Sequence, residues 1–190
     1  MTVIERNTKE TNIKASLTLY GEGNSTITTG IGFFNHMLEA FSKHGLLDLE
    51  LVCEGDVYVD FHHSVEDTGI VIGQALHKEI FPIENIERYG EATVVMDEAS
   101  VNTALDLSNR PFLYFDVDIK DKIGDFDTEL VEEFFRALCF HAGITAHIVM
   151  LRGKNRHHIV EAAFKSFAVA LRRATEKNSR IGVPSTKGVL

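Results

Sequence analysis

The sequence has few cysteines and no apolar run long enough to cross a bilayer. Cys53 and Cys139 form neither a disulfide framework nor a zinc-binding pattern, so we expect both to be reduced residues of the core. The N-terminal segment MTVIERNTKE has no apolar signal region. Together these absences favour a cytoplasmic protein that does not engage a membrane.

Positive charge is also scarce. Lysine and arginine number 19 against 28 aspartates and glutamates, which gives a net charge of -9 and argues against nucleic acid as the main partner. No linker, low-complexity tract or charge block interrupts the chain. With 190 residues, 44% hydrophobic and 25% charged, it is long enough to bury a core. A local anion site remains compatible with this composition.

One pattern occurs twice: His62-His63-x-x-Glu66 is repeated as His157-His158-x-x-Glu161, 95 positions later, half the length of the chain. The apolar residues that follow each copy recur at intervals of three and four, as in an amphipathic helix. Similar stretches also precede the two copies, GLLDLELVCEG at 45–55 and GITAHIVMLRG at 143–153. The sequence therefore predicts two halves built on one plan.

Helical spacing gives the pattern a metal-binding interpretation. Residues four apart share a helix face, so His62 with Glu66, and His157 with Glu161, can each grip one ion. Adjacent residues point about 100° apart, which turns the second histidine of each pair toward a different ion. A lone histidine is more often a core or surface residue, but adjacent histidines followed by a carboxylate have little use in packing. By symmetry we expect two groups, His62, Glu66 and His158 in one and His157, Glu161 and His63 in the other.

A fourth ligand for each ion is expected from the preceding helix. Superposing the apolar stripes of the two halves places His36 opposite Glu133. Glu133 could equally be a solvent-facing helix residue.

The organisation predicted from periodicity and turn residues is an α+β layered fold, an internally duplicated sandwich with one sheet per half backed by two helices. We expect residues 1–90 and 91–190 to be half-repeats of one compact domain. The predicted elements are strands near 2–7, 12–20 and 25–29, a helix at 33–44, a strand at 46–54 and a helix at 63–80, then strands near 91–97, 101–107 and 112–119, a helix at 128–141, a strand at 144–152 and a helix at 158–176.

Several basic residues are candidates for an anion site, although each by itself is most simply a solvated surface charge. Arg110, in LSNRP between two predicted strands, can present its guanidinium fork to a phosphate or carboxylate. Ser185, Thr186 and Lys187 combine hydroxyls with a cation in the C-terminal segment.

Longer motifs carry a resemblance to a known family. TGIGFFNHML at 29–38, the segments at 55–76 and 153–172 around the two HHxxE copies, MDE at 96–98, LDLSNRP at 105–111 and PSTKGVL at 184–190 closely resemble the imidazoleglycerol-phosphate dehydratase family of histidine biosynthesis. The likeness covers nearly the whole chain, in order. It implies a hydro-lyase that converts imidazole glycerol phosphate to imidazole acetol phosphate with two manganese(II) ions per subunit. It also implies halves like domain 2 of ribosomal protein S5, and a homo-oligomer of 24 subunits with sites between subunits.

The resemblance also implies residue roles. One manganese site would take His36, His63, His157 and Glu161, and the other His62, Glu66 and His158. Glu10 corresponds to the carboxylate that removes a proton from the substrate, with His44 as the next candidate. We expect catalysis to depend on Glu10, His36, His62, Glu66 and Lys165, and substrate binding on Glu10, His44, Arg88, Arg110, Lys165, Ser185, Thr186 and Lys187.

The chain departs from the family pattern at a few positions. Some relatives read VEHFF where this chain reads VEEFF, so the ligand role of Glu133 is open; Asn35 and Asn109 differ from many relatives without removing a ligand. A donor set of nitrogen and oxygen suits manganese, iron, cobalt or zinc, so the choice of manganese depends on the resemblance. Two alternatives from other classes are a dinuclear metallohydrolase of phosphate esters and a non-catalytic metal-binding cage protein.

Overall fold

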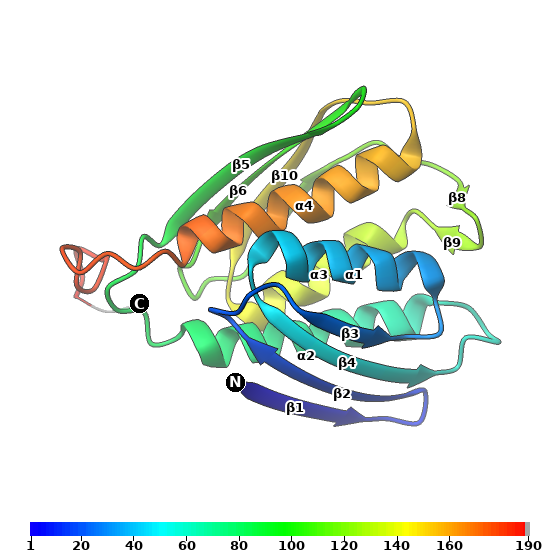
Figure 1. Cartoon of the computed structure of the whole chain (residues 1–190), viewed down its shortest axis with the longest axis horizontal. Helices are drawn as coiled ribbons and strands as arrows, with labels where there is room; N and C mark the ends of the chain where they lie inside the picture. Colours follow the sequence, from blue (N-terminus) through cyan, green and yellow to red (C-terminus); the bar gives the residue numbers. More distant parts are fainter. Residues whose placement is uncertain (189–190) are drawn as a thin grey trace.

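The computed structural model describes residues 1–188; Val189 and Leu190, which end the PSTKGVL motif, lie outside the described residues. Two four-stranded sheets enclose the helices between them (Figure 1). The elements are β1 (Thr2–Asn7), β2 (Thr11–Thr18), β3 (Ser25–Thr28), α1 (Gly32–Gly45), β4 (Asp48–Gly55), α2 (His62–Ile80), β5 (Tyr89–Met96), β6 (Ala99–Asp106), β7 (Phe112–Asp116), β8 (Lys122–Ile123), β9 (Phe126–Asp127), α3 (Leu130–Ala142), β10 (Thr145–Arg152) and α4 (Arg156–Ala174).

The two halves share one topology, as the repeated motif predicts. The first sheet has the order β1-β2-β4-β3 and the second β5-β6-β10-β7, and in each the last pair of strands is parallel while the other pairs are antiparallel. The α+β class and the duplication are therefore confirmed. The small β8–β9 hairpin between β7 and α3 was not predicted, because two-residue strands leave no periodic signal.

The core lies where the apolar faces of the sheets meet the helices. Along β2, Ile13, Ala15 and Leu17 are buried while the intervening positions are more exposed, which is the alternation of a sheet covered on one face. Helix α1 contacts α4, and α2 contacts α3, so each half supplies one helix to each pair. Cys53 and Cys139 are buried and unpaired, as expected.

Helices α2 and α3 approach each other closely through two glycines on α2. A Cβ atom at Gly69 would lie 2.7 Å from the carbonyl oxygen of Phe134, and one at Gly73 would lie 2.6 Å from that of Leu138. Both distances are shorter than van der Waals contact, so these positions require the absence of a side chain. None of the helices in the described part of the chain has the length and apolar character needed to cross a membrane.

We predict that Gly69→Ala destabilises the protein even though alanine is the better helix former. Forcing a methyl group against the Phe134 backbone should cost about 1–3 kcal/mol, as overpacking does elsewhere. Gly32→Ala is the matched control, because a Cβ there meets no atom within 4 Å. It should be neutral or slightly stabilising. Thermal unfolding at equal protein concentration measures both, and a Gly69→Ala midpoint at or above that of the parent would contradict the prediction.

Candidate active site

The starts of α2 and α4 place the two HHxxE copies in equivalent positions. The side chain of Asp60 accepts a hydrogen bond from the backbone N–H of His62 at 2.8 Å, and that of Asn155 from His157 at 2.9 Å. Each acceptor stands two residues before the first histidine and binds an N–H that the helix itself cannot satisfy. The paired histidines of both halves therefore lie in the first helical turn.

Three of the predicted ligands come together at the start of α4. The Nε2 atoms of His157 and His36 lie 3.0 Å and 3.5 Å from the same carboxylate oxygen, Oε2 of Glu161. Their donor atoms all lie within 4.8 Å of one another, and residues 1–188 contain no second group of three or more such side chains. His36 comes from α1, so the group depends on the packing of α1 against α4. Two imidazoles and a carboxylate form a donor set that fits a divalent transition metal.

Glu161 is the buried member of this group, with 7% of its side chain exposed. Burial opposes its ionisation, but the hydrogen bond and positive charge of Lys165 and the hydrogen bond of His157 outweigh burial and lower its pKa. Lys165 lies one turn further along α4 and contacts Oε1 of Glu161. The carboxylate is therefore ionised at neutral pH, the state that a metal ligand needs.

The equivalent pair on α2, His62 and Glu66, is farther apart and more exposed. His62 Nε2 lies 3.6 Å from Glu66 Oε2, and nearly half of each side chain is exposed. Glu133, the expected partner from α3, has Oε1 3.9 Å from Nε of Arg136. The structure thus brings His62 and Glu66 together as predicted, but the described residues of one chain do not add a third ligand to them.

The second histidine of each pair turns to a different carboxylate. His63 Nδ1 lies 3.0 Å from Asp56 Oδ2, and His158 Nδ1 lies 2.8 Å from Glu98 Oε2. These hydrogen bonds raise the pKa of both imidazoles. The expectation that His63 would join His157 and Glu161, and that His158 would join His62 and Glu66, is not met within the described residues of one chain, where each of these histidines contacts another carboxylate instead; adjacent residues of each pair do diverge, as helix geometry requires.

Glu10 lies in the turn between β1 and β2, and its Oε1 is 3.9 Å from His63 Nε2. A polar network that includes the buried side chains of Thr11 and Asp67 holds this turn on α2. The Thr8 hydroxyl accepts hydrogen bonds from the backbone N–H groups of Glu10 and Thr11, and the Thr11 hydroxyl donates to Asp67, which also pairs with Arg6 at 3.0 Å. The exposed carboxylate of Glu10 is therefore presented from a fixed backbone.

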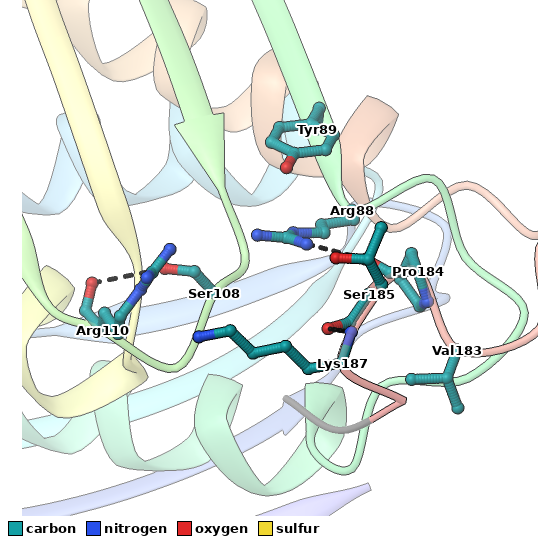
Figure 2. A pocket seen from close by; sticks show the side chains of 9 residues that line it. Arg88, Tyr89, Ser108, Arg110, Val183, Pro184, Ser185 and Lys187 are labelled. Atoms are coloured by element: carbon teal, nitrogen blue, oxygen red, sulfur yellow. Dashed lines mark hydrogen bonds between the residues drawn. The ribbon is translucent and has the colours of Figure 1, made fainter.

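A cavity of about 570 Å³ lies at the other end of the molecule. The side chains of Arg88, Arg110 and Lys187 converge on it (Figure 2). Arg88 donates two hydrogen bonds to the Asp106 carboxylate, at 2.7 Å and 3.0 Å, and one to the carbonyl oxygen of Pro184. Arg88 thereby ties the C-terminal segment to the cavity wall. The remaining lining residues are Tyr89, Ser108, Val183, Pro184, Ser185 and Thr186.

The cavity and the histidine–carboxylate group are separated by the length of α4. The backbone N–H of Arg88 donates to the carbonyl of Ala174 at the end of α4, whereas His157 lies in its first turn. Seventeen residues at 1.5 Å per residue place these points about 26 Å apart. Of the predicted substrate-binding residues, Arg88, Arg110, Ser185, Thr186 and Lys187 line the cavity; Glu10, His44 and Lys165 do not.

Four carboxylates of the site were given no role by the sequence prediction: Asp56, Asp97, Glu98 and Asp106. The internal repeat offers a signal for two of them, because the β5–β6 turn that carries Asp97 and Glu98 is the counterpart of the β1–β2 turn that carries Glu10. Asp97 lies 3.8 Å from His158 Nε2, much as Glu10 does from His63. Asp56 and Asp106 gave no signal, since an acidic residue in a loop or strand end is usually solvated.

Two solved structures that share this duplicated fold are those of dehydratases, enzymes of the hydro-lyase class, which remove water from their substrate. The family model described as imidazoleglycerol-phosphate dehydratase matches residues 29–171. The chain belongs to the imidazoleglycerol-phosphate dehydratase family and is therefore a hydro-lyase of histidine biosynthesis.

Individual relatives agree over the whole length. The imidazoleglycerol-phosphate dehydratase of Aliarcobacter butzleri is 63% identical over 190 residues, covering 100% of both chains, and that of Campylobacter concisus is 64% identical, covering 98% of this chain and 96% of its own. The Pyrococcus furiosus crystal structure matches with a TM-score of 0.86 at 40% identity, covering 98% of this chain and 100% of that one. The Staphylococcus aureus structure gives 0.82 at 42%, covering 93% and 100%.

We predict that Thr11→Val lowers the thermal stability of the protein. The change keeps the shape of the side chain but leaves an oxygen of the buried Asp67 without its hydroxyl donor, at a cost of about 1–3 kcal/mol. Thr26→Val on β3 removes a hydroxyl from an exposed strand position and serves as the control. Differential scanning calorimetry at equal concentration compares the two, and equal midpoints would show that the Thr11–Asp67 bond contributes nothing to stability.

Proposed function

We propose that this chain removes water from imidazole glycerol phosphate to give imidazole acetol phosphate, using two manganese(II) ions per subunit, in the cytoplasm. The observation that carries the proposal is the convergence of His36, His157 and Glu161 on one point. A cation-lined cavity that suits a phosphate supports it. A non-catalytic metal cage would have no use for that cavity.

The proposed ligand sets are those that the family resemblance implies, and the grouping of His36, His157 and Glu161 supports one of them. His36, His157 and Glu161 would hold one ion together with His63, and His62, Glu66 and His158 would hold the other, with Glu133 as its candidate fourth ligand. All donors are imidazole nitrogens or carboxylate oxygens, a set that manganese accepts. A bound dication would depress the pKa of the substrate ring N–H and so favour departure of the neighbouring C3 hydroxyl.

Glu10 is proposed as the general base. The hydrogen on C2 of the substrate is not acidic by itself, because no carbonyl group adjoins that carbon. Glu10 lies exposed beside His63, where an ionised carboxylate can take the C2 proton once the C3 hydroxyl is leaving. Loss of the hydroxyl and this proton gives an enol, which becomes the ketone of the product.

The cations of the cavity are proposed to bind the phosphate. Arg110 and Lys187 lie free of carboxylate partners in residues 1–188, so their charges are available to an anion. Arg88 is already paired with Asp106 and would add only its remaining N–H groups. Ser185 and Thr186 bring hydroxyls from the C-terminal segment that Arg88 anchors.

The site would be composite. A molecule with an imidazole ring, three carbons and one phosphate is far shorter than the roughly 26 Å between the cavity and the histidines of one chain. The histidines of one subunit and the cavity of another would therefore have to meet around each substrate. Such sharing agrees with assembly into 24 subunits.

The proposal is tested by incubating the purified protein with imidazole glycerol phosphate and following the ketone product. We expect about two manganese ions per chain in the active protein, loss of turnover on chelation and recovery on adding manganese. The phosphate ester should remain intact, which distinguishes dehydration from hydrolysis. Full activity with fewer than one ion per chain would contradict the metal assignment, and release of inorganic phosphate would favour the hydrolase alternative.

Substitutions at Glu10 and Arg110 should separate chemistry from binding. Glu10→Gln keeps the shape but removes the base, so kcat should fall by roughly 100-fold or more with metal content unchanged. Arg110→Ala removes a charge-assisted contact of about 1.5–3 kcal/mol and should act mainly on KM. Arg152→Ala, at an exposed position that ends β10, is the control and should change neither constant. A near-parental kcat for Glu10→Gln would assign the proton transfer to another group.

A further inference from the structure

Two of the five histidines proposed as ligands are held at their Nδ1 atom. His158 Nδ1 is 2.8 Å from Glu98 Oε2, and His63 Nδ1 is 3.0 Å and 3.2 Å from the two oxygens of Asp56. Within residues 1–188, His36, His62 and His157 have no carboxylate at this atom; their close carboxylates lie at Nε2. The Nε2 atoms of His36, His62 and His157 lie near the carboxylate of another proposed ligand. Within residues 1–188, the Nε2 atoms of His63 and His158 do not.

The bond to Nδ1 determines which nitrogen carries hydrogen. An ionised carboxylate only accepts hydrogen bonds, so Nδ1 must donate and the neutral ring keeps its lone pair on Nε2. The other oxygen of Glu98 accepts hydrogen bonds from two backbone N–H groups, an arrangement that suits an ionised carboxylate acting only as an acceptor. The metal-binding nitrogen is thereby left open.

Glu98 is itself held in place. Its Oε1 accepts hydrogen bonds from the backbone N–H groups of Lys154 and Asn155, at 3.1 Å and 2.6 Å, just before α4 begins. These two bonds aim Oε2 at His158. They also link the β5–β6 turn to the start of α4, so the position of the imidazole is set by two elements at once.

Within residues 1–188, the Nε2 atoms of both histidines make no hydrogen bond to protein. His158 Nε2 lies 3.8 Å from Asp97, and His63 Nε2 lies 3.9 Å from Glu10, both too long for a hydrogen bond. The two side chains are 23% and 34% exposed. The Nε2 lone pair of each imidazole is therefore accessible to a metal ion at the surface.

The carboxylates that bind Nδ1 of His63 and His158 come from different positions in the two halves. Asp56 stands seven residues before His63, in the loop between β4 and α2, but the residue seven before His158 is Leu151 on β10. Glu98 instead comes from the β5–β6 turn. In both halves a carboxylate therefore binds Nδ1 of the second histidine, although the carboxylate comes from a different position in each half. This indicates that the function of the contact is to orient the imidazole ring.

We propose that Glu98 and Asp56 are positioning residues, which hold His158 and His63 with Nε2 directed outward and free to bind a metal ion. This inference rests on the metal binding proposed above. Neither carboxylate is proposed to touch the metal or the substrate. Both act through the imidazole that they orient, as carboxylates behind metal-binding histidines do in general.

Glu98→Gln gives a sharp test. The side-chain oxygen of the introduced glutamine would stay on the two backbone N–H groups, so its NH2 group would face His158 Nδ1 and donate to it. The neutral ring would then carry its hydrogen on Nε2, the atom needed for metal. We expect nitrogen NMR of full-length, metal-free protein with labelled histidine to show this change of tautomer at His158. Calorimetric titration should show one of the two manganese ions bound about 10–100-fold more weakly.

Glu91→Gln is the matched control, because it removes the same charge from β5 at a carboxylate that contacts Asn102 and no histidine. Asp56→Ala should weaken binding of the other manganese ion, and Glu54→Ala on neighbouring β4 is its control. Unchanged manganese affinities in Glu98→Gln and Asp56→Ala would overturn the proposal. If the parent protein binds no manganese, the proposed function fails, and the His158 tautomer alone decides whether Glu98 positions the ring: a switch in Glu98→Gln supports it and an unchanged tautomer refutes it.

Discussion

The length and direction of the two long helices constrain all the chemistry of this molecule. Helices α2 and α4 run the same way in Figure 1, with their histidines at one end. The segments that follow their other ends supply Arg88 and Lys187 to the cavity. A helix of 19 residues spans about 28 Å and does not shorten, so imidazoles and cations of one chain stay apart. The proposal of a site shared between copies depends on this rigidity.

The rigidity itself comes from close packing between the halves. Gly69 and Gly73 let α2 approach the backbone of α3, and α1 contacts α4 where His36 meets His157. Because interiors packed to this density transmit small shifts, the distance between His36 and Glu161 depends on residues far from either. The histidine–carboxylate group is thus a product of helix packing, not of local sequence alone.

Charge is distributed unevenly in a chain with a net charge of -9. Carboxylates gather around the imidazoles at the helix starts, where Glu98, Asp56 and Glu161 each accept from a histidine. Cations gather at the opposite end, where Asp106 neutralises Arg88 but Arg110 and Lys187 face the cavity. One end is therefore suited to a metal ion and the other to an anion, despite the acidic whole.

The sequence by itself determined the duplicated α+β fold, because periodic apolar residues specify helices and strands and the repeat of HHxxE marks two halves. It also determined that His62 approaches Glu66 and His157 approaches Glu161, since residues four apart share a helix face. The resemblance already grouped His36 with Glu161, but their contact requires the packing of α1 against α4. Tertiary structure alone decided that Glu98 and Asp56 bind the remaining histidines, and that the cavity lies a helix length away. These contacts join residues between 7 and 125 positions apart, and periodicity carries no information about such distances in space.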